Sequence, residues 1–350
     1  MKKMAVLAVG FFLLFFAFPI AGDAAETLKF SPEKPLKIRV GLDDRPDLKY
    51  PDYAFGVVFK SVIETQTNGA VMVDIFSGGK LGSMKERLQM VQSGALEASM
   101  DTGTMAGFFP EWQVVYIPYL FRSYEVAWEF FDNSEVFAAI KERMRKKTGF
   151  RVLGVGGNGF RSFQTSKREL RTPEDFKGMK FRVMQSPIFV KLVEALGAKA
   201  VPISWSELYT AMQTGVVDGA EVPPAYVEMG KLYEVQKYFI LNKHQFSDDL
   251  FVINDSFFQR LPEGVQKVFM AAARQAAVAD RAADLMLQEV TALEVLKKHM
   301  KIYSPSSEEI EKFKKISGPP VVEWLKGQIG AETVQAVMDE VKKIEKKLGY

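Results

Sequence analysis

Apolar and polar residues alternate along the first part of the chain with two different periods. In residues 36–42 and 71–76 apolar side chains recur at every second position, which is typical of a half-buried β-strand. In residues 53–67 and 85–92 they recur at the spacing of an amphipathic helix. A third strand is predicted at residues 96–100. Strands that alternate with helices build parallel α/β sheets, so this part of the chain is predicted to form an α/β lobe.

The same alternation returns after an irregular middle stretch and then gives way to helix. The strands and helices of a second α/β lobe are predicted, in chain order, at residues 179–184, 187–196, 200–203 and 206–214. Residues 238–253 are rich in strand-forming side chains. Beyond Pro262 the pattern is almost wholly helical, and residues 263–300 are predicted to form one unusually long helix. Two α/β lobes followed by a helical C-terminal third is the simplest interpretation.

The N-terminus has the pattern of a secretory signal peptide. Lys2 and Lys3 precede an apolar run at residues 4–18, and small residues follow, with Gly22 and Ala24 suited to a cleavage site after Ala24. The alternative is an uncleaved anchor, but the run is shorter than the ~20 residues that a membrane-spanning helix needs. We therefore expect a protein secreted into the periplasm, with residues 1–24 removed.

Composition excludes several kinds of chemistry. The formal charge is only +3, which does not favour nucleic acid as the partner. The absence of cysteine excludes disulfides, thiolate nucleophiles and cysteine-based zinc sites. The two histidines, His244 and His299, have no G-x-S-x-G serine context, and no carboxylate spacing indicates a metal. We expect neither an enzyme nor a cofactor.

The stretch GVGGNGFR at residues 154–161 contains glycines in the spacing G-x-G-x-x-G. A dinucleotide-binding turn requires a helix to begin at these glycines. The chain instead continues as FRSFQT, and the next helix start signal is Thr172-Pro173, more than a dozen residues later. The dinucleotide interpretation is therefore rejected, and the glycines are interpreted as a flexible crossing between the two lobes.

Two arginines stand where a ligand could meet them. Arg161 follows the glycine-rich stretch, and Arg182 lies inside the apolar strand FRVM. An arginine in a core strand is costly unless a partner neutralises it, and its guanidinium suits a carboxylate through two parallel hydrogen bonds. The partner is either the carboxylate of a ligand or a structural ion pair, for which the candidates are Glu194, Glu207, Asp218 and Glu221.

Several segments carry a family resemblance. The pieces NGFRSFQTSKRELRTPEDFKGMKFRVMQSP and LGAKAVPISWSELYTAMQTGVVDGAEVPP, with TNGAVMVDIFSGGKLGS and IPYLFRS upstream and LYEVQKYFILNKHQFSDDLFVIN downstream, span most of the chain. This sequence closely resembles the DctP-type solute-binding proteins of tripartite ATP-independent periplasmic (TRAP) transporters. The resemblance implies an α/β, two-lobed periplasmic binding protein fold with a ligand cleft, a long lobe-spanning helix and a helical C-terminal region.

The resemblance also implies boundaries and roles. We expect lobe I at residues 36–158, with parts of 245–350 returning to it, lobe II at 159–244, and the helical C-terminal region with the bracing helix at 262–350. An organic acid would bind between the lobes, which would close and dock on the small and large TRAP membrane subunits. Some family members dimerise through C-terminal helices, so a homodimer stays open. A ligand sensor for a membrane receptor and a secreted α/β hydrolase or lyase are the alternative functions.

Residue by residue, the resemblance implies a carboxylate site in the second lobe. Arg182 matches the arginine that usually pairs with the ligand carboxylate, and Arg161 matches a second arginine of that site. Trp205 falls at an aromatic position that typically packs on the ligand. The family often has an asparagine after the glutamate at Glu221, where this chain has Val222, which cannot donate a hydrogen bond. We expect the anion site to be completed differently or the ligand to be more apolar.

Ligand contacts from the first lobe are less well specified by the sequence. Asp44 follows the first predicted strand, and Thr102 follows the third. Both are candidates for ligand contact, although short polar side chains after strands also serve in turns and helix caps.

Overall fold

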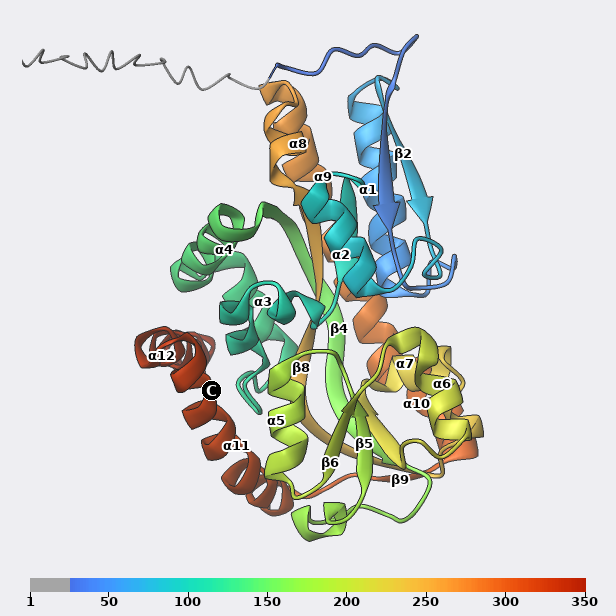
Figure 1. The fold of residues 1–350 in the computed structure, drawn as a ribbon, viewed down its shortest axis with the longest axis vertical. Helices are drawn as coiled ribbons and strands as arrows, with labels where there is room; N and C mark the ends of the chain where they lie inside the picture. Colours follow the sequence, from blue (N-terminus) through green and yellow to red (C-terminus); the bar gives the residue numbers. More distant parts are fainter. Residues whose placement is uncertain (1–25) are drawn as a thin grey trace, which may run out of the picture.

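The computed structural model describes residues 26–350, so the predicted signal peptide and its cleavage site lie outside the described residues. Within residues 26–350 the strands form one mixed sheet in the order β2-β1-β3-β8-β4-β7-β5-β6, with β9 paired to β8. Two lobes are built on the two ends of this sheet (Figure 1). The predicted fold class is confirmed, and no helix in this part of the chain is long and apolar enough to cross a membrane.

The first lobe is the parallel α/β unit predicted for the N-terminal part. Strand β1 lies between β2 and β3 and is parallel to both. Buried side chains of these strands and of α1 form its core, including Ile38, Phe55 and Phe59. The elements are β1 (Leu36–Gly41), α1 (Pro51–Gln66), β2 (Val71–Phe76), α2 (Met84–Ser93) and β3 (Ala98–Asp101).

The second lobe repeats the architecture. Strand β5 pairs in parallel with β6 and β7, and helices follow each strand. The predicted helix start at Thr172 proved to be a single 3-10 turn, Pro173–Phe176, although Thr172 and Asp175 do form a capping box. The elements are β5 (Lys180–Val183), α5 (Pro187–Ala195), β6 (Lys199–Pro202), α6 (Trp205–Gln213), β7 (Gly219–Val222) and α7 (Pro224–Met229).

Two long antiparallel strands connect the lobes. Strand β4 (Phe150–Thr165) pairs with β8 (Tyr238–Asn254) from end to end. At one end β8 also pairs with β3 of the first lobe, and at the other end β4 pairs with β7 of the second (Figure 1). Side chains at the middle of these two strands therefore lie where the lobes meet.

The glycine-rich stretch forms the middle of β4, so it does cross between the two lobes, as a strand paired with β8. Its glycines also allow close approach of the long helix. A Cβ atom on Gly156 would lie 2.1 Å from Oδ1 of Asp280, and one on Gly157 would lie 2.8 Å from Oδ2 of Asp284. One helical turn after Asp284, a Cβ atom on Gly159 would lie 2.6 Å from Cδ of Gln288. The dinucleotide interpretation was correctly rejected, because β4 continues as a strand beyond the glycines.

The predicted long helix is present and contacts both lobes. Helix α9 (Glu263–Met286) continues through a π-helical turn (Leu287–Thr291) into α10 (Ala292–His299). Helix α9 packs against α1 and β4, and α10 packs against α7, so the continuous helix braces the first lobe against the second (Figure 1). A single π-helical turn inside an α-helix often marks a functional position.

The remaining helices cover the side of the molecule. Helices α11 and α12 pack on each other, and then on α5 of the second lobe and on α3 (Figure 1). Pro319 and Pro320 lie within α11. The bounds of these elements are α3 (Tyr124–Asn133), α4 (Glu135–Thr148), α8 (Asp255–Gln259), β9 (Lys301–Tyr303), α11 (Ser307–Ile329) and α12 (Ala331–Leu348).

Candidate functional site

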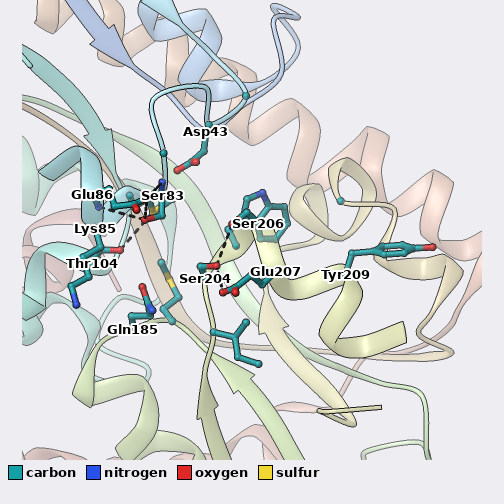
Figure 2. A pocket seen from close by; sticks show the side chains of 18 of the residues that line it. Asp43, Ser83, Lys85, Glu86, Thr104, Gln185, Ser204, Ser206, Glu207 and Tyr209 are labelled. Carbon is teal, nitrogen blue, oxygen red and sulfur yellow. Dashed lines mark hydrogen bonds between the residues drawn. The ribbon is translucent and has the colours of Figure 1, made fainter. Parts of the chain in front are cut away.

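A cleft with a volume of about 930 Å³ lies between the lobes. This volume is in the range of small-molecule binding sites. From the first lobe, Ser83, Lys85 and Glu86 of the α2 region face it, and from the second lobe Ser204 and Glu207 do so (Figure 2). The Ser204 hydroxyl is hydrogen-bonded to the Glu207 carboxylate at 2.5 Å, so Glu207 braces the start of α6.

A narrower inner cavity of about 30 Å³ continues from the cleft toward the crossing strands. It shares part of its lining with the cleft, including Arg182, Met184 and Trp205. Six of the seven site residues predicted from the sequence line this cavity: Arg182, Arg161, Trp205, Val222, Asp44 and Thr102. The seventh, Glu221, does not line it.

Arg182 lies at the boundary of the two cavities, on strand β5. Its side chain is almost fully buried, and its Nε donates a 2.8 Å hydrogen bond to the carbonyl oxygen of Ile203. Within residues 26–350 no acidic side chain forms a salt bridge with it. Burial lowers the pKa of Arg182 to about 10, although the charge of Glu221 partly opposes that effect. A buried cation without a partner is energetically costly, so this position favours an incoming anion.

Arg161, in contrast, has a structural partner. Its guanidinium forms a buried ion pair with Glu221 and also donates to the Glu221 carbonyl oxygen at 2.6 Å. His244 lies 3.8 Å from the same carboxylate, and Arg161 and His244 together lower the pKa of Glu221 against the opposing effect of burial. Of the two arginines, the structural ion pair left open by the sequence is therefore found for Arg161 and not for Arg182.

Aromatic and apolar side chains from the second lobe form one wall of the inner cavity. Trp205, the first residue of α6, packs edge-to-face on Tyr226 with 6.0 Å between ring centroids. Val222 ends β7 and is buried beside them. The hydroxyl of Tyr226 has no hydrogen-bond partner within the described residues. This wall offers an apolar surface and one free hydroxyl.

Acidic and hydroxyl side chains from the first lobe and the crossing strands form another part of the lining. Asp44 accepts a 3.0 Å hydrogen bond from the backbone N–H of Asp52, which satisfies one free donor in the first turn of α1. Thr102 shares a 3.0 Å hydrogen bond with Ser247. The turn and capping roles considered for Asp44 and Thr102 are thus observed, and both side chains also line the cavity. Burial, with the nearby charge of Asp52, raises the pKa of Asp44.

The sequence analysis did not find several of the lining residues. Asn158, Asp52, Asp101, Tyr226 and Asp249 all line the inner cavity. For Asp249 a signal was present, because this charged residue lies in the strand-forming segment 238–253, directly before the apolar run LFVI. Arg182 is a similar charge inside the apolar strand FRVM. The other four have no local pattern that separates them from ordinary core or helix-end residues.

Two α/β lobes joined by crossing strands, a cleft between them and a buried arginine that forms no salt bridge within residues 26–350 are the features of an extracytoplasmic solute-binding protein. The family model for "Bacterial extracellular solute-binding protein, family 7", DctP, matches residues 48–327. The chain belongs to this DctP family, the periplasmic solute-binding proteins of TRAP transporters.

Individual relatives support the same assignment. The C4-dicarboxylate-binding periplasmic protein DctP of Rhodobacter capsulatus is 31% identical over 286 residues, which cover 80% of this chain and 84% of that protein. The sugar acid binding protein of Advenella mimigardefordensis in complex with galactonate is 32% identical, with a TM-score of 0.83 over 89% of this chain and 99% of that chain. A TRAP periplasmic solute binding protein from Desulfovibrio salexigens with bound orotic acid is 28% identical, with a TM-score of 0.83 over 88% of this chain and 99% of that chain.

Proposed function

We propose that this protein captures an organic acid by binding its carboxylate to Arg182, and that it delivers the acid to TRAP membrane subunits. The observation that carries the proposal is the environment of Arg182, which is buried at the mouth of the inner cavity and, among residues 26–350, has a carbonyl oxygen but no carboxylate as partner. A carboxylate would neutralise this charge through two charge-assisted hydrogen bonds. Closure of the lobes would remove water and strengthen the pair.

The charges around the inner cavity favour an acid with a single carboxylate. Arg161 is already neutralised by Glu221, so Arg182 is the arginine of this cavity without a salt bridge in the described chain. The other ionisable residues that line the cavity in the described chain are aspartates and one tyrosine, which supply no second cation for another carboxylate, while their oxygens can accept hydrogen bonds from hydroxyl groups. The carboxyl groups concerned are those of Asp43, Asp44, Asp52, Asp101 and Asp249. Val222 and Trp205 add an apolar surface for the body of the ligand.

A thermal-shift screen of refolded mature protein against organic acids tests this proposal. Galactonate and galactarate form a matched pair, since they differ in the second carboxylate. Ligand at 100 times its dissociation constant adds roughly 2.7 kcal/mol to the free energy of unfolding, which corresponds to several degrees. We expect larger shifts for monocarboxylates than for their dicarboxylate partners. A panel in which no acid raises the melting temperature would contradict carboxylate capture.

Export, assembly and the alternative functions belong to the same proposal. We infer cleavage after Ala24, docking of the ligand-bound form on the small and large TRAP membrane subunits, and no catalytic role; the homodimer stays an open alternative. The intact mass of protein isolated from the periplasm tests the cleavage site. Unchanged ligand recovered after long incubation would argue against a hydrolase or lyase. Ligand uptake that depends on both membrane subunits would argue against a receptor-linked sensor.

A further inference from the structure

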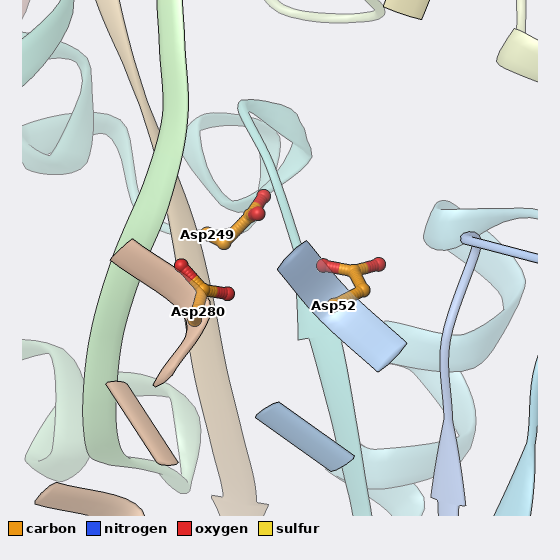
Figure 3. A group of neighbouring side chains, drawn as sticks. All are labelled: Asp52, Asp249 and Asp280. Carbon is orange, nitrogen blue, oxygen red and sulfur yellow. The ribbon is translucent and has the colours of Figure 1, made fainter. Parts of the chain in front are cut away.

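Three buried aspartates converge where α1, β8 and α9 meet. Asp52 comes from the first turn of α1, Asp249 from β8 and Asp280 from α9. One carboxylate oxygen from each lies within 4.8 Å of the other two, and all three side chains are buried. Figure 3 shows the three carboxylates drawn together from separate elements. The sequence positions are far apart, which explains why no spacing signal predicted this group.

Each carboxylate is oriented through one oxygen and leaves the other unpaired. Oδ2 of Asp52 accepts from the backbone N–H of Asp43 at 3.3 Å. Oδ1 of Asp249 accepts from the Asn158 amide at 2.9 Å, and Oδ1 of Asp280 accepts from the N–H of Gly157 at 2.6 Å. The second oxygen of each side chain is buried and has no hydrogen-bond partner within residues 26–350. Ligands held from behind in this way are typical of a metal site with an ordered outer shell.

The neighbouring cations are already used elsewhere. Arg87 pairs with Asp43, and Arg281 pairs with Asp132, so neither forms a salt bridge with the three carboxylates. The glycines of β4 allow Asp280 to approach this closely, since any side chain at Gly156 would displace it. Three buried carboxylates without a positive partner are costly to ionise together.

A second observation, outside the acidic group, also indicates a bound species. Tyr226, on α7 of the second lobe, is only 9% exposed, and its hydroxyl has no partner in the described chain. It lines the same inner cavity as Asp52 and Asp249. Unpaired polar atoms of Asp52, Asp249 and Tyr226 therefore lie in residues that line one cavity, as expected where an ion and its remaining oxygen ligands belong.

We propose that Asp52, Asp249 and Asp280 form a binding site for a hard cation, with Ca²⁺ as the best match. All three ligands are carboxylate oxygens, the donors that Ca²⁺ takes in variable geometry. Mg²⁺ fits less well, because it requires near-ideal octahedral geometry and gives up its water reluctantly. The site would fasten the long helix to the first lobe at the floor of the ligand cavity. Asp44 and Asp101 are not among the proposed ligands and can still ionise. A bound divalent ion would therefore not make the acidic part of the cavity lining positively charged.

The test uses chelator-treated mature protein without organic ligand, so it is independent of the proposed function. Melting temperature is measured with CaCl₂, MgCl₂, and choline chloride at matched ionic strength. Bound calcium is measured directly by elemental analysis after dialysis. The variants are Asp280→Asn and Asp52→Asn, and the matched control is Asp74→Asn, which removes an exposed carboxylate on β2.

We expect Ca²⁺ to raise the melting temperature by several degrees at about 100 times its dissociation constant, with one ion bound per chain. Both aspartate variants should lose the shift and the bound ion, and Asp74→Asn should keep both. No calcium binding by the parent protein would overturn the proposal in favour of carboxyls that share protons. Equal binding by the parent protein and both variants would also overturn it, because the ion would then lie elsewhere.

Discussion

Arg161 and Arg182 line the same inner cavity, but their partners give them different roles. Arg161 forms a buried ion pair with Glu221, whereas Arg182 donates to the carbonyl oxygen of Ile203 and has no salt bridge in the part of the chain that the structure describes. A paired arginine positions and shapes the site, while an unpaired one attracts an anion. At the scale of residues, we therefore expect the number of arginines without a salt bridge to influence how many carboxylates the inner cavity accepts.

Replacing Glu221 by glutamine should change this count. Glu221→Gln removes the negative charge and leaves Arg161 buried without a counter-charge. The free energy of unfolding should therefore decrease by up to roughly 3–5 kcal/mol, and the melting temperature should fall with it. The freed Arg161 should then attract a second carboxylate, so galactarate should gain affinity relative to galactonate. Isothermal titration of both acids measures the change. An unchanged ratio would mean that Glu221 does not control the selectivity.

Asp101 gives a pH dependence whose sign can be worked out. It is buried beside Asp248, with Arg87 nearby, and burial raises its pKa to about 7. A carboxyl whose pKa is higher in the folded than in the unfolded state keeps its proton longer in the folded protein. The folded protein is therefore fully stable below about pH 4 in this respect and loses stability as the pH rises from about 4 to 7. Asp101→Asn cannot ionise and keeps an oxygen for the N–H of Met105.

The variant should therefore unfold at a similar temperature to the parent protein at pH 4 and at a higher temperature at pH 8. Melting curves across this range for both proteins are the measurement. A parallel decline in the two proteins would show that Asp101 ionises normally in the folded state.

At the scale of elements, the contact between β4 and the long helix sets the geometry of the lobe junction. Asp280, Asp284 and Gln288 are spaced four residues apart, so they share one face of the helix and lie over Gly156, Gly157 and Gly159. The glycine spacing that resembles a nucleotide-binding motif is thus explained by packing. The helix can lie close to the strand because these positions have no side chain.

Gly156→Ala tests this contact. The added Cβ would lie 2.1 Å from the Asp280 carboxylate, so the helix or the carboxylate must move, and we expect a loss of about 3 kcal/mol of unfolding free energy. Gly264→Ala, in the first turn of α9 with open space around it, is the control and should be neutral or slightly stabilising. Denaturant titration of both variants gives the comparison. Equal stabilities would contradict the packing account.

Much of the fold, but only part of the site, could be predicted from local sequence. The spacing of apolar residues predicted the strands and helices of the two lobes and the helices after Pro262, because hydrophobic periodicity follows directly from burial on one face of an element. Arg182 was found because a charge inside an apolar strand is unusual. Asp52, Asp249 and Asp280 were missed as a group, since only tertiary packing brings them together. The two-lobed assignment itself depended on family resemblance as well as on pattern.

At the scale of the whole molecule, the two crossing strands and the long helix join the lobes around the cleft. A ligand that contacts both walls stabilises the closed arrangement only by as much as it binds that arrangement better than the open one. Small-angle X-ray scattering with and without a saturating ligand should show a smaller radius of gyration when the ligand is bound. An unchanged radius at saturation would contradict closure while leaving the carboxylate site untouched.

The central claim is that Arg182 holds the carboxylate of the ligand. The most direct measurement is isothermal titration of the acid with the largest thermal shift into the parent protein, Arg182→Ala and the control Arg274→Ala, whose side chain is exposed on α9. Loss of a buried, hydrogen-bonded charge pair costs roughly 2–5 kcal/mol. We predict at least a 30-fold weaker affinity for Arg182→Ala, with unchanged affinity for the control. Near-parental affinity of Arg182→Ala would contradict the account.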